Sequence, residues 1–316
     1  MDKENFTRLR GELFYDHPLA RYTSWHVGGK AERFYRPGDL SDLQDFLTQL
    51  PSDEPLTWLG LGSNVLIRDG GIKGAVILTL NRLKELSVVN SQLVFEEQSG
   101  IQDFLSGNGK TIIRAEAGIT CAKLAKFCVS QGLEDGAFFA GIPGTVGGAL
   151  AMNAGAFGSE TWCNVIGVET MSHQGEILKR TPGEFKIHYR QVEGLENQFF
   201  IAGYFCFNRG DPEKVKTAIN MLLKKRNLSQ PIGKYSCGSV FRNPPGDYAA
   251  RLIESAGLKG KSIGNAEVSE KHANFILNKG NASAANIEAL IHYVAQHVSQ
   301  IHDIQLVKEV HIIGRS

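Results

Sequence analysis

Residues 141–158 read GIPGTVGGALAMNAGAFG, and their six glycines and four alanines leave the backbone almost without side-chain bulk. Such a backbone can approach a large flat or anionic ligand closely, and its free N–H groups can point at phosphate oxygens. A flexible linker is the alternative interpretation. Linkers are polar, whereas this stretch also carries Ile142, Leu150 and Phe157. We therefore expect a buried loop that holds a ligand.

A second glycine-containing turn lies at residues 60–64, between the apolar runs 56–59 and 65–67. It is not a GxGxxG dinucleotide fingerprint, because Val65 stands at the third glycine position and the following residues favour a turn over a helix start. A phosphate-binding turn between two strands fits better, with backbone N–H groups, Ser63 and Asn64 as donors. A plain hairpin turn is the alternative.

Other candidate motifs predict no chemistry of their own. Gly109-Lys110-Thr111 lacks the glycine that a Walker A loop needs five residues earlier, where Phe104 stands. No G-x-S-x-G elbow surrounds Ser239, so a hydrolase nucleophile is not expected there. The nine histidines show neither HExxH nor zinc-finger spacing, and we expect no metal. His26 is interpreted as a structural histidine, with covalent flavin attachment as the alternative.

Composition narrows the class of protein. A chain of 316 residues that is 42% hydrophobic can form two or three domains with real cores. Its 34 basic and 33 acidic residues give a net charge of +1, which is not typical of a nucleic-acid-binding protein. No apolar run is long enough to span a membrane, and the charged N-terminal residues do not resemble a signal peptide. Five scattered cysteines without CxxC pairing indicate a reduced, cytoplasmic protein.

Strands and helices of the first two thirds of the chain must position these turns. An apolar stripe predicts a helix over residues 40–50, capped by Asp39 or Ser41. Residues 74–118 are strand-rich, including a run at 93–98, and Thr120 caps a helix that ends at Gly132. Residues 165–180 predict a hairpin around 172–175, and 199–209 a further strand. Arg190 lies near the end of an exposed strand.

The remainder begins with a helix that starts at Asp211-Pro212 and ends at the basic residues 224–226, which favour a helix C-terminus. A domain boundary is expected near 210–230. Residues 248–256 predict a short helix, 271–278 a strand, and the apolar positions from 287 to 298 a helix packed by one face. Residues 304–314 predict a last strand, in which Glu309 stands among apolar neighbours.

Together these stretches resemble the family of UDP-N-acetylenolpyruvoylglucosamine reductases of bacterial cell-wall synthesis, from residue 23 to residue 314. The pieces that carry the resemblance are TSWHVGG, GLGSNVLI, GIPGTVGGALAMNAGAFG, HYR, CGSVFRNP, KHANFILN and KEVHIIG. One glycine-rich match alone would be weak evidence. The occurrence of all seven in order is strong evidence.

The resemblance implies an α+β fold: an FAD-binding fold of the vanillyl-alcohol-oxidase (PCMH) type in two subdomains, with a smaller α+β substrate domain. The expected divisions are 1–73 for the first FAD-binding subdomain, 74–210 for the second, and 211–300 for the substrate domain. Residues 301–316 are expected to return near the active site. FAD is the implied cofactor, NADPH its reductant, and a UDP-sugar the substrate. No nucleic-acid or membrane partner is implied, the oligomeric state is open, and a monomer is compatible with the sequence.

The resemblance also implies roles for particular residues. Arg190 matches the arginine of a Tyr-Arg pair, Ser239 the serine that protonates C2, Glu309 a late glutamate, and Asn243 a substrate-contact asparagine. The cofactor-binding positions are Gly60, Gly62, Ser63, Asn64, Gly118, Pro143, Gly144, Thr145, Gly147, Gly148, Asn153, Ala154 and Gly155. The chain departs from the family in having Gln191-Val192 where a serine often follows the arginine, and in lacking a tyrosine-bearing insertion.

The residue types suit the implied reaction, in which hydride addition at C3 pushes negative charge toward C2 and the carboxylate. A guanidinium can stabilise that charge and a hydroxyl can deliver the proton. Two alternatives are a flavin oxidase of the same fold acting on a small hydroxy acid, and a non-catalytic nucleotide-binding module. The module would have no use for Arg190, Ser239 and Glu309 together.

Overall fold

The computed structural model of the chain describes residues 6–89 and 109–316. Its first sheet has the strand order β1-β2-β5-β3, in which β2 and β3 run parallel to β5 and β1 runs antiparallel to β2. The bounds are β1 (Glu12–Pro18), β2 (Lys30–Arg36), β3 (Leu56–Leu59) and β5 (Ile72–Leu78). The chain reaches β2 from β1 through the 3-10 turn η1 (Ala20–Tyr22).

Helix α1 (Leu40–Thr48) packs on this sheet through the predicted apolar stripe, of which Leu43, Phe46 and Leu47 are buried. Asp39 is its N-cap, because its carboxylate accepts a hydrogen bond from the backbone N–H of Asp42. The structure therefore selects Asp39 over Ser41.

The second sheet is antiparallel throughout and has the order β11-β10-β14-β7-β6. Its strands are β6 (Leu86–Val89), β7 (Lys110–Glu116), β10 (Val165–Met171), β11 (Ile177–Arg180) and β14 (Phe199–Asn208). The β10–β11 hairpin and the long strand β14 confirm the prediction for these segments. The strand predicted at 93–98 lies outside the described residues.

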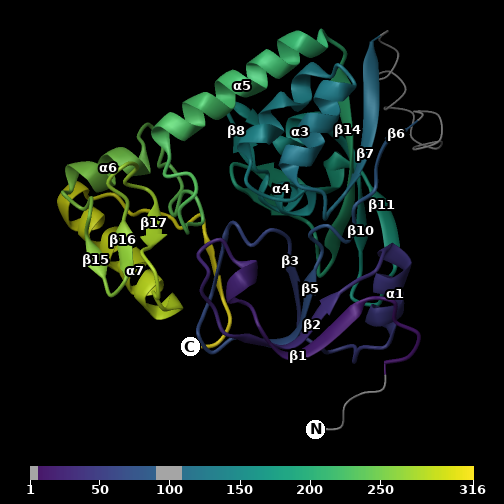
Figure 1. Cartoon of the computed structure of the whole chain (residues 1–316), viewed down its shortest axis with the longest axis horizontal. Helices are drawn as coiled ribbons and strands as arrows, with labels where there is room; N and C mark the ends of the chain where they lie inside the picture. The colour runs from purple at the N-terminus through teal and green to yellow at the C-terminus, as the bar shows by residue number, and fades with distance from the viewer. Residues whose placement is uncertain (1–5, 90–108) are drawn as a thin grey trace.

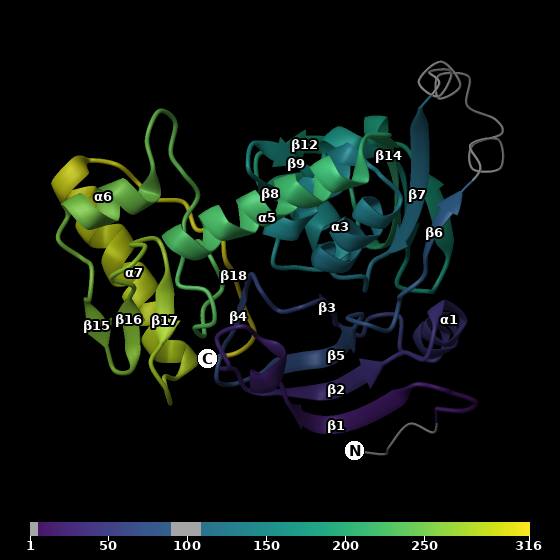
Figure 2. The ribbon, with the colours of Figure 1, turned by 45° about the horizontal axis from the view of Figure 1, so that its top comes forward.

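One face of this sheet is covered by α3 (Cys121–Ser130), η3 (Glu134–Gly141) and α4 (Val146–Met152), as Figure 1 shows. Thr120 caps α3 as predicted, its side chain accepting from the N–H of Lys123. Figure 2 shows the first sheet lying below these helices. The short elements between them are β8 (Gly155–Ala156), β9 (Ser159–Glu160), η4 (Thr161–Asn164), η5 (Pro182–Glu184), β12 (Lys186–His188) and β13 (Gln191–Glu193).

Helix α5 (Pro212–Ser229) begins at the predicted Asp211 N-cap and packs against η3 and α3. It runs from the second sheet toward the C-terminal unit (Figure 1). That unit contains α6 (Ala249–Ser255), β15 (Ser262–Ile263), β16 (Ala266–Val268), β17 (Ile276–Asn278) and α7 (Ala284–His302). The apolar face of α7 fills its core as predicted.

Two predicted strands are shorter in the structure. Of residues 271–278 only β17 is extended, because the backbone N–H groups of Lys271 and His272 turn back to the hydroxyl of Ser269. Of residues 304–314 only β18 (His311–Ile313) is a strand, and it pairs in parallel with β4 (Val65–Ile67). The C-terminal segment thereby returns to the turn at residues 60–64.

Candidate active site

A cleft of about 660 Å³ lies where the turn at 60–64, the glycine-rich stretch, the end of α5 and the C-terminal segment meet. Most of the predicted site residues line it: Gly60, Gly62, Ser63, Asn64, Pro143, Gly144, Thr145, Gly148, Ala154, Gly155, Arg190, Ser239 and Glu309. They come from positions up to 249 residues apart, 309 minus 60. The fold therefore brings the two glycine-containing turns and the three candidate catalytic residues to one place.

Four predicted residues lie outside the lining. A Cβ on Gly118 would lie 1.9 Å from the carbonyl oxygen of Thr79, and one on Gly147 would lie 2.8 Å from the Cβ of Ala117, so both glycines permit close packing. Asn153 is buried in a left-handed conformation at the end of α4. The carboxamide oxygen of Asn243 accepts from the backbone N–H of Ala249 at the start of α6.

The turn at residues 60–64 is not a hairpin, since β3 belongs to the first sheet and β4 pairs with β18. Within the described part of the chain, its five backbone N–H groups donate no hydrogen bond to a protein acceptor. Because these residues line the cleft, their donors are available to a ligand. Free backbone donors in such a turn suit an anionic group.

The glycine-rich stretch differs from the expected loop, because residues 146–152 form α4. Its backbone donors are also largely used: the N–H groups of Val146 and Gly147 bond to the carbonyls of Ile119 and Ala117. Its glycines act instead by leaving room. A Cβ on Gly144 or Gly148 would have no neighbour closer than 3.7 Å, so these two positions form a cradle that side chains would fill.

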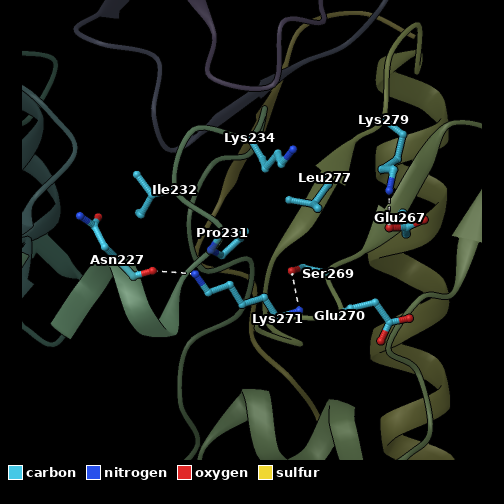
Figure 3. A pocket seen from close by; sticks show the side chains of 10 residues that line it. All are labelled: Asn227, Pro231, Ile232, Lys234, Glu267, Ser269, Glu270, Lys271, Leu277 and Lys279. Atoms are coloured by element: carbon cyan, nitrogen blue, oxygen red, sulfur yellow. Dashed lines mark hydrogen bonds and ion pairs between the residues drawn. The ribbon is translucent and has the colours of Figure 1, made fainter. Parts of the chain in front are cut away.

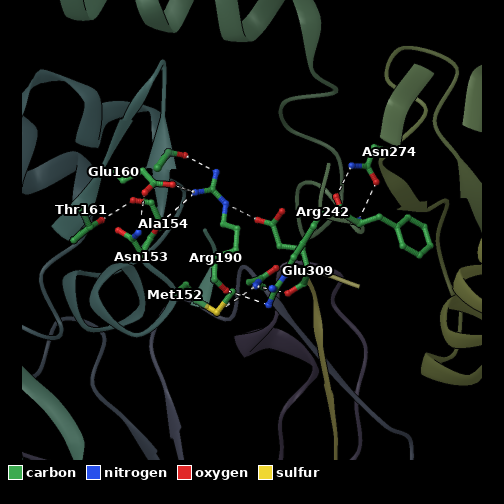
Figure 4. Close-up of polar contacts among 12 residues, drawn as sticks. Met152, Asn153, Ala154, Glu160, Thr161, Arg190, Arg242, Asn274 and Glu309 are labelled. Atoms are coloured by element: carbon green, nitrogen blue, oxygen red, sulfur yellow. Dashed lines mark hydrogen bonds and ion pairs between the residues drawn. The ribbon is translucent and has the colours of Figure 1, made fainter. Parts of the chain in front are cut away.

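Arg190 sits in the tight turn between β12 and β13, with a left-handed φ of 59°. Its guanidinium donates to the carbonyls of Asn153 and Gly155 at 3.3 and 3.1 Å, and its Nε donates to Glu309 Oε1 at 3.1 Å (Figure 4). The ring of Tyr189 lies 4.8 Å from the guanidinium carbon. These contacts fix the plane of the guanidinium at the edge of the cleft.

Glu309 is held by backbone contacts on both sides. Its N–H donates to the carbonyl of Val240 at 2.8 Å, and its carbonyl accepts from the side chain of Asn64 at 3.0 Å. Burial raises the pKa of the Glu309 carboxyl, and the positive charges of Arg190 and Arg242 oppose that rise. Glu309 can therefore hold a proton at a higher pH than an exposed glutamate.

Ser239 lies in a loop at the other side of the cleft, after Gly238, whose φ is 72°. Its hydroxyl makes no hydrogen bond with a described residue, and it is therefore available to a ligand. The neighbouring thiol of Cys237 is buried against the carbonyl of Val65, and burial raises its pKa to about 12. Cys237 therefore stays protonated at neutral pH and is not a nucleophile.

Other lining residues were not predicted. Lys225 and Arg226 extend from the end of α5 to the cleft, whereas the sequence suggested only a favourable contact with the helix C-terminus. Trp58, Phe275 and His311 also line it. Apolar and basic residues are common in any sequence, so the spacing of these residues does not mark them as part of a site. Lys225, Arg226 and His311 reach the cleft only through the packing of α5 and β18.

A second cavity, of about 560 Å³, opens on the C-terminal unit (Figure 3). Its lysines are largely engaged nearby: Lys271 donates to the carbonyl of Asn227, and Lys279 pairs with Glu267 at 3.0 Å. No predicted site residue lines it. Among the described residues, no cluster of His, Cys, Asp or Glu could hold a metal. His26 packs on Tyr235 and does not line the cleft.

Residues 31–181 match the family model of the FAD binding domain, a range that contains β3, β5 and all but the first residue of β2 in the first sheet, and all strands of the second sheet except β14. With the cleft beside it, this match defines an FAD-binding oxidoreductase. The crystal structure of UDP-N-acetylenolpyruvylglucosamine reductase from Thermus caldophilus superposes with a TM-score of 0.76 at 27% identity, over 97% of this chain and 100% of that one. These findings confirm the predicted α+β, vanillyl-alcohol-oxidase-type fold. No helix among the described residues is long and apolar enough to cross a membrane.

Residues 230–313 match the family model of the UDP-N-acetylenolpyruvoylglucosamine reductase C-terminal domain. The chain is 93% identical to the reductase of that name from Coxiella burnetii (strain RSA 493 / Nine Mile phase I) over 100% of both chains. It is 52% identical to that of Legionella pneumophila (strain Paris), over 99% of this chain and 98% of the relative. The chain belongs to the UDP-N-acetylenolpyruvoylglucosamine reductase family. This membership confirms the predicted enzyme class and leaves the hydroxy-acid oxidase and the non-catalytic module without support.

Proposed function

We propose that Arg190, Ser239 and Glu309 act together on the enolpyruvyl group of UDP-N-acetylenolpyruvoylglucosamine, which is reduced to UDP-N-acetylmuramate for peptidoglycan synthesis. FAD is the cofactor and NADPH the reductant. One observation supports the assignment: these three side chains line the same cleft as the turn at residues 60–64 and the glycine-rich stretch. Asn243, which lies outside the lining, stays a predicted substrate contact.

The residues of the cleft fit FAD. The free backbone donors of residues 60–64 would hold its diphosphate, and the open positions at Gly144 and Gly148 would admit a flat ring system. Lys225 and Arg226 add positive charge to the same cleft. FAD, when bound, supplies the hydride that adds to C3 of the enolpyruvyl group.

Arg190 is suited to hold the substrate carboxylate. Two backbone carbonyls and Glu309 fix its guanidinium before substrate arrives, so little reorganisation is needed as negative charge grows. The planar group can bind a carboxylate through two parallel hydrogen bonds. Arg190 therefore orients the enolpyruvyl group and stabilises the charge that hydride addition creates.

Ser239 delivers the proton to C2. Hydride addition at C3 leaves an electron pair at C2, and transfer of the Ser239 hydroxyl proton completes the reduced carbon–carbon bond. Its hydroxyl lines the cleft, carries a transferable proton and makes no hydrogen bond with a described residue. Burial raises the pKa of Glu309, and the protonated form of its carboxyl would be able to donate a hydrogen bond to the developing enolate beside Arg190.

Replacing Ser239 by Ala tests this assignment. Reduction of the enzyme by NADPH should be nearly unchanged, because Ser239 has no part in it. Reoxidation by the enolpyruvyl substrate should slow by about 10²–10⁴, the range of general acid catalysis. Ser239→Cys, which retains a transferable proton, should recover part of that loss. Stopped-flow measurement of the two half-reactions decides, and equal slowing of both would remove Ser239 from the catalytic groups.

We further propose that the enzyme acts in the cytoplasm, since all five cysteines are unpaired. We keep the division at 1–73, 74–210 and 211–300, with 301–316 returning to the site, as a proposal. The return of 301–316 is supported by the pairing of β18 with β4.

A further inference from the structure

Arg242 has no role in the mechanism above, yet its guanidinium lies beside the active-site turn. Its Nη2 donates to the carbonyl oxygen of Arg190 at 3.2 Å, and its Nη1 lies 3.5 Å from the carboxamide oxygen of Gln191 (Figure 4 shows the first contact). It forms no ion pair with a described carboxylate, and no described residue hydrogen-bonds its buried Nε. Arg242 does not line the cleft. The hydrogen bonds of this half-buried guanidinium therefore all go to the turn that carries Arg190.

The backbone that carries Arg242 is held firmly. The side chain of Asn274 accepts from the N–H of Phe241 at 3.0 Å and donates to its carbonyl at 2.8 Å. The N–H of Arg242 itself donates to the carbonyl of Val307 at 2.8 Å. Residues 239–242 form one short segment. In it, the carbonyl of Val240 accepts from the N–H of Glu309, and Ser239 is the preceding residue. Arg242 thus projects from a fixed point that it shares with the other two candidate catalytic residues.

The turn that it reaches is one that needs support. Arg190 adopts a left-handed φ of 59°, which is unfavourable for a residue with a long side chain. The side-chain amide of Gln191, the next residue in the turn, donates to Glu193 at 2.8 Å. The carbonyl of Arg190 would face no other described donor if Arg242 were absent.

We propose that Arg242 is a positioning residue that holds the turn of Arg190 in register with Ser239 and Glu309, so that the arginine, the serine and the glutamate meet the substrate as one unit. The proposal rests on the catalytic role assigned to Arg190 above. Arg242, from the C-terminal unit, supplies the one described hydrogen-bond donor to the carbonyl of Arg190. Its planar fork matters as well as its charge, because it reaches toward two oxygens.

The test uses the FAD-loaded protein and measures the two half-reactions separately. Arg242→Gln should slow reoxidation by the enolpyruvyl substrate by about 10- to 100-fold, the effect of losing one hydrogen bond from a charged group. Reduction by NADPH should stay within about twofold of the wild type. Arg242→Lys keeps the charge but not the planar fork, and its reoxidation rate should lie between those of the wild type and Arg242→Gln. Arg251→Gln, an exposed arginine of the same unit, is the control and should leave both rates unchanged.

A double variant separates positioning from an independent effect. If Arg242 acts through Arg190, then Arg190→Lys with Arg242→Gln should be no more than about twofold slower than Arg190→Lys alone. Multiplication of the two effects, equal slowing of both half-reactions, or a wild-type rate in both Arg242 variants would each overturn the proposal. If Arg190→Lys alone had no effect on reoxidation, the role of Arg190 would fail first, and that of Arg242 with it.

Discussion

Arg190 is the residue at which most of the site's contacts converge. Its side chain bonds two carbonyls of the segment that follows α4 and the carboxylate of Glu309, and its carbonyl accepts from Arg242. The three side-chain contacts come from three different nitrogens of one planar group, so a lysine, with a single nitrogen, cannot reproduce them. The guanidinium is thus oriented by the protein rather than by the substrate.

Arg190→Lys should slow reoxidation by the enolpyruvyl substrate by about 10²–10³, the usual cost of removing one preorganised donor. Lysine keeps the charge but cannot bind a carboxylate with two parallel hydrogen bonds. Stopped-flow absorbance of the flavin measures the rate, with Arg251→Lys as the control on an exposed arginine. Turnover close to that of the wild type would assign Arg190 to structure instead.

Glu309 should give the reoxidation rate a dependence on pH. Burial raises its pKa, against the opposing charges of Arg190 and Arg242, and the proton-bearing form decreases as the pH rises through that pKa. If this form assists the reaction, the rate should fall over the same interval. In Glu309→Gln, which does not titrate, that limb should be absent and the rate lower throughout. An identical limb in the variant would show that another group titrates.

At the scale of elements, the glycines in and near the cleft have two different structural roles. Gly144 and Gly148 leave open space, whereas Gly118 and Gly147 allow two backbones to pack. The same residue type therefore predicts opposite effects of substitution at neighbouring places.

Gly144→Val should lower FAD retention while leaving the fold intact, because the new side chain projects into the cleft, where the nearest atom to its Cβ is the Ser63 hydroxyl at 3.7 Å. Flavin absorbance of the purified protein and the unfolding midpoint of the FAD-free form measure the two effects. Gly183→Val, with no heavy atom within 4 Å of its Cβ, is the matched control. Full FAD retention would place the cofactor elsewhere.

Gly118→Ala, in contrast, should destabilise the protein by at least about 1–3 kcal/mol, the usual cost of overpacking, because its Cβ would collide with the carbonyl of Thr79. Chemical denaturation of the FAD-free protein measures this. A normal midpoint combined with lost flavin would instead favour the predicted cofactor contact of Gly118.

At the scale of the whole molecule, the C-terminal unit is tied to the N-terminal part close to the site. Both carboxylate oxygens of Asp69 accept from the first backbone N–H groups of α7, those of Ala284 and Ala285, each at 3.0 Å. The guanidinium of Arg68 binds both oxygens of Glu288 on the same helix. Trp25 and Val27 complete the core of the C-terminal unit.

Asp69→Ala should lower the free energy of unfolding by about 0.5–2 kcal/mol, as the loss of a helix cap does, because two backbone donors of α7 lose their acceptor. Asp69→Asn, which keeps one oxygen, should cost less. Denaturant titration measures both, and Asp53→Ala, on an exposed loop, is the control. Equal stability of Asp69→Ala and the control would show that water satisfies these donors.

The glycine-rich stretches, the helix caps at Thr120 and Asp211, the strand β14 and the helix α7 follow from the sequence, because each depends on neighbours within a few residues. The sequence left the cap of α1 open between Asp39 and Ser41. The motifs in order also identify the family, and with it the fold. The helix α4 was missed, because glycine disfavours helices unless tertiary packing compensates. That packing places its start against Ala117 and Ile119.

Only the tertiary structure decided which distant groups meet. Lys225 and Arg226 reach the cleft because α5 packs on η3, and Glu309 reaches Arg190 because β18 pairs with β4. Spacing along the chain contains no measure of such contacts. Arg242 shows this most plainly: its sequence neighbours predict nothing of the Arg190 turn 52 residues away, which it reaches only because Asn274 and Val307 hold its backbone there.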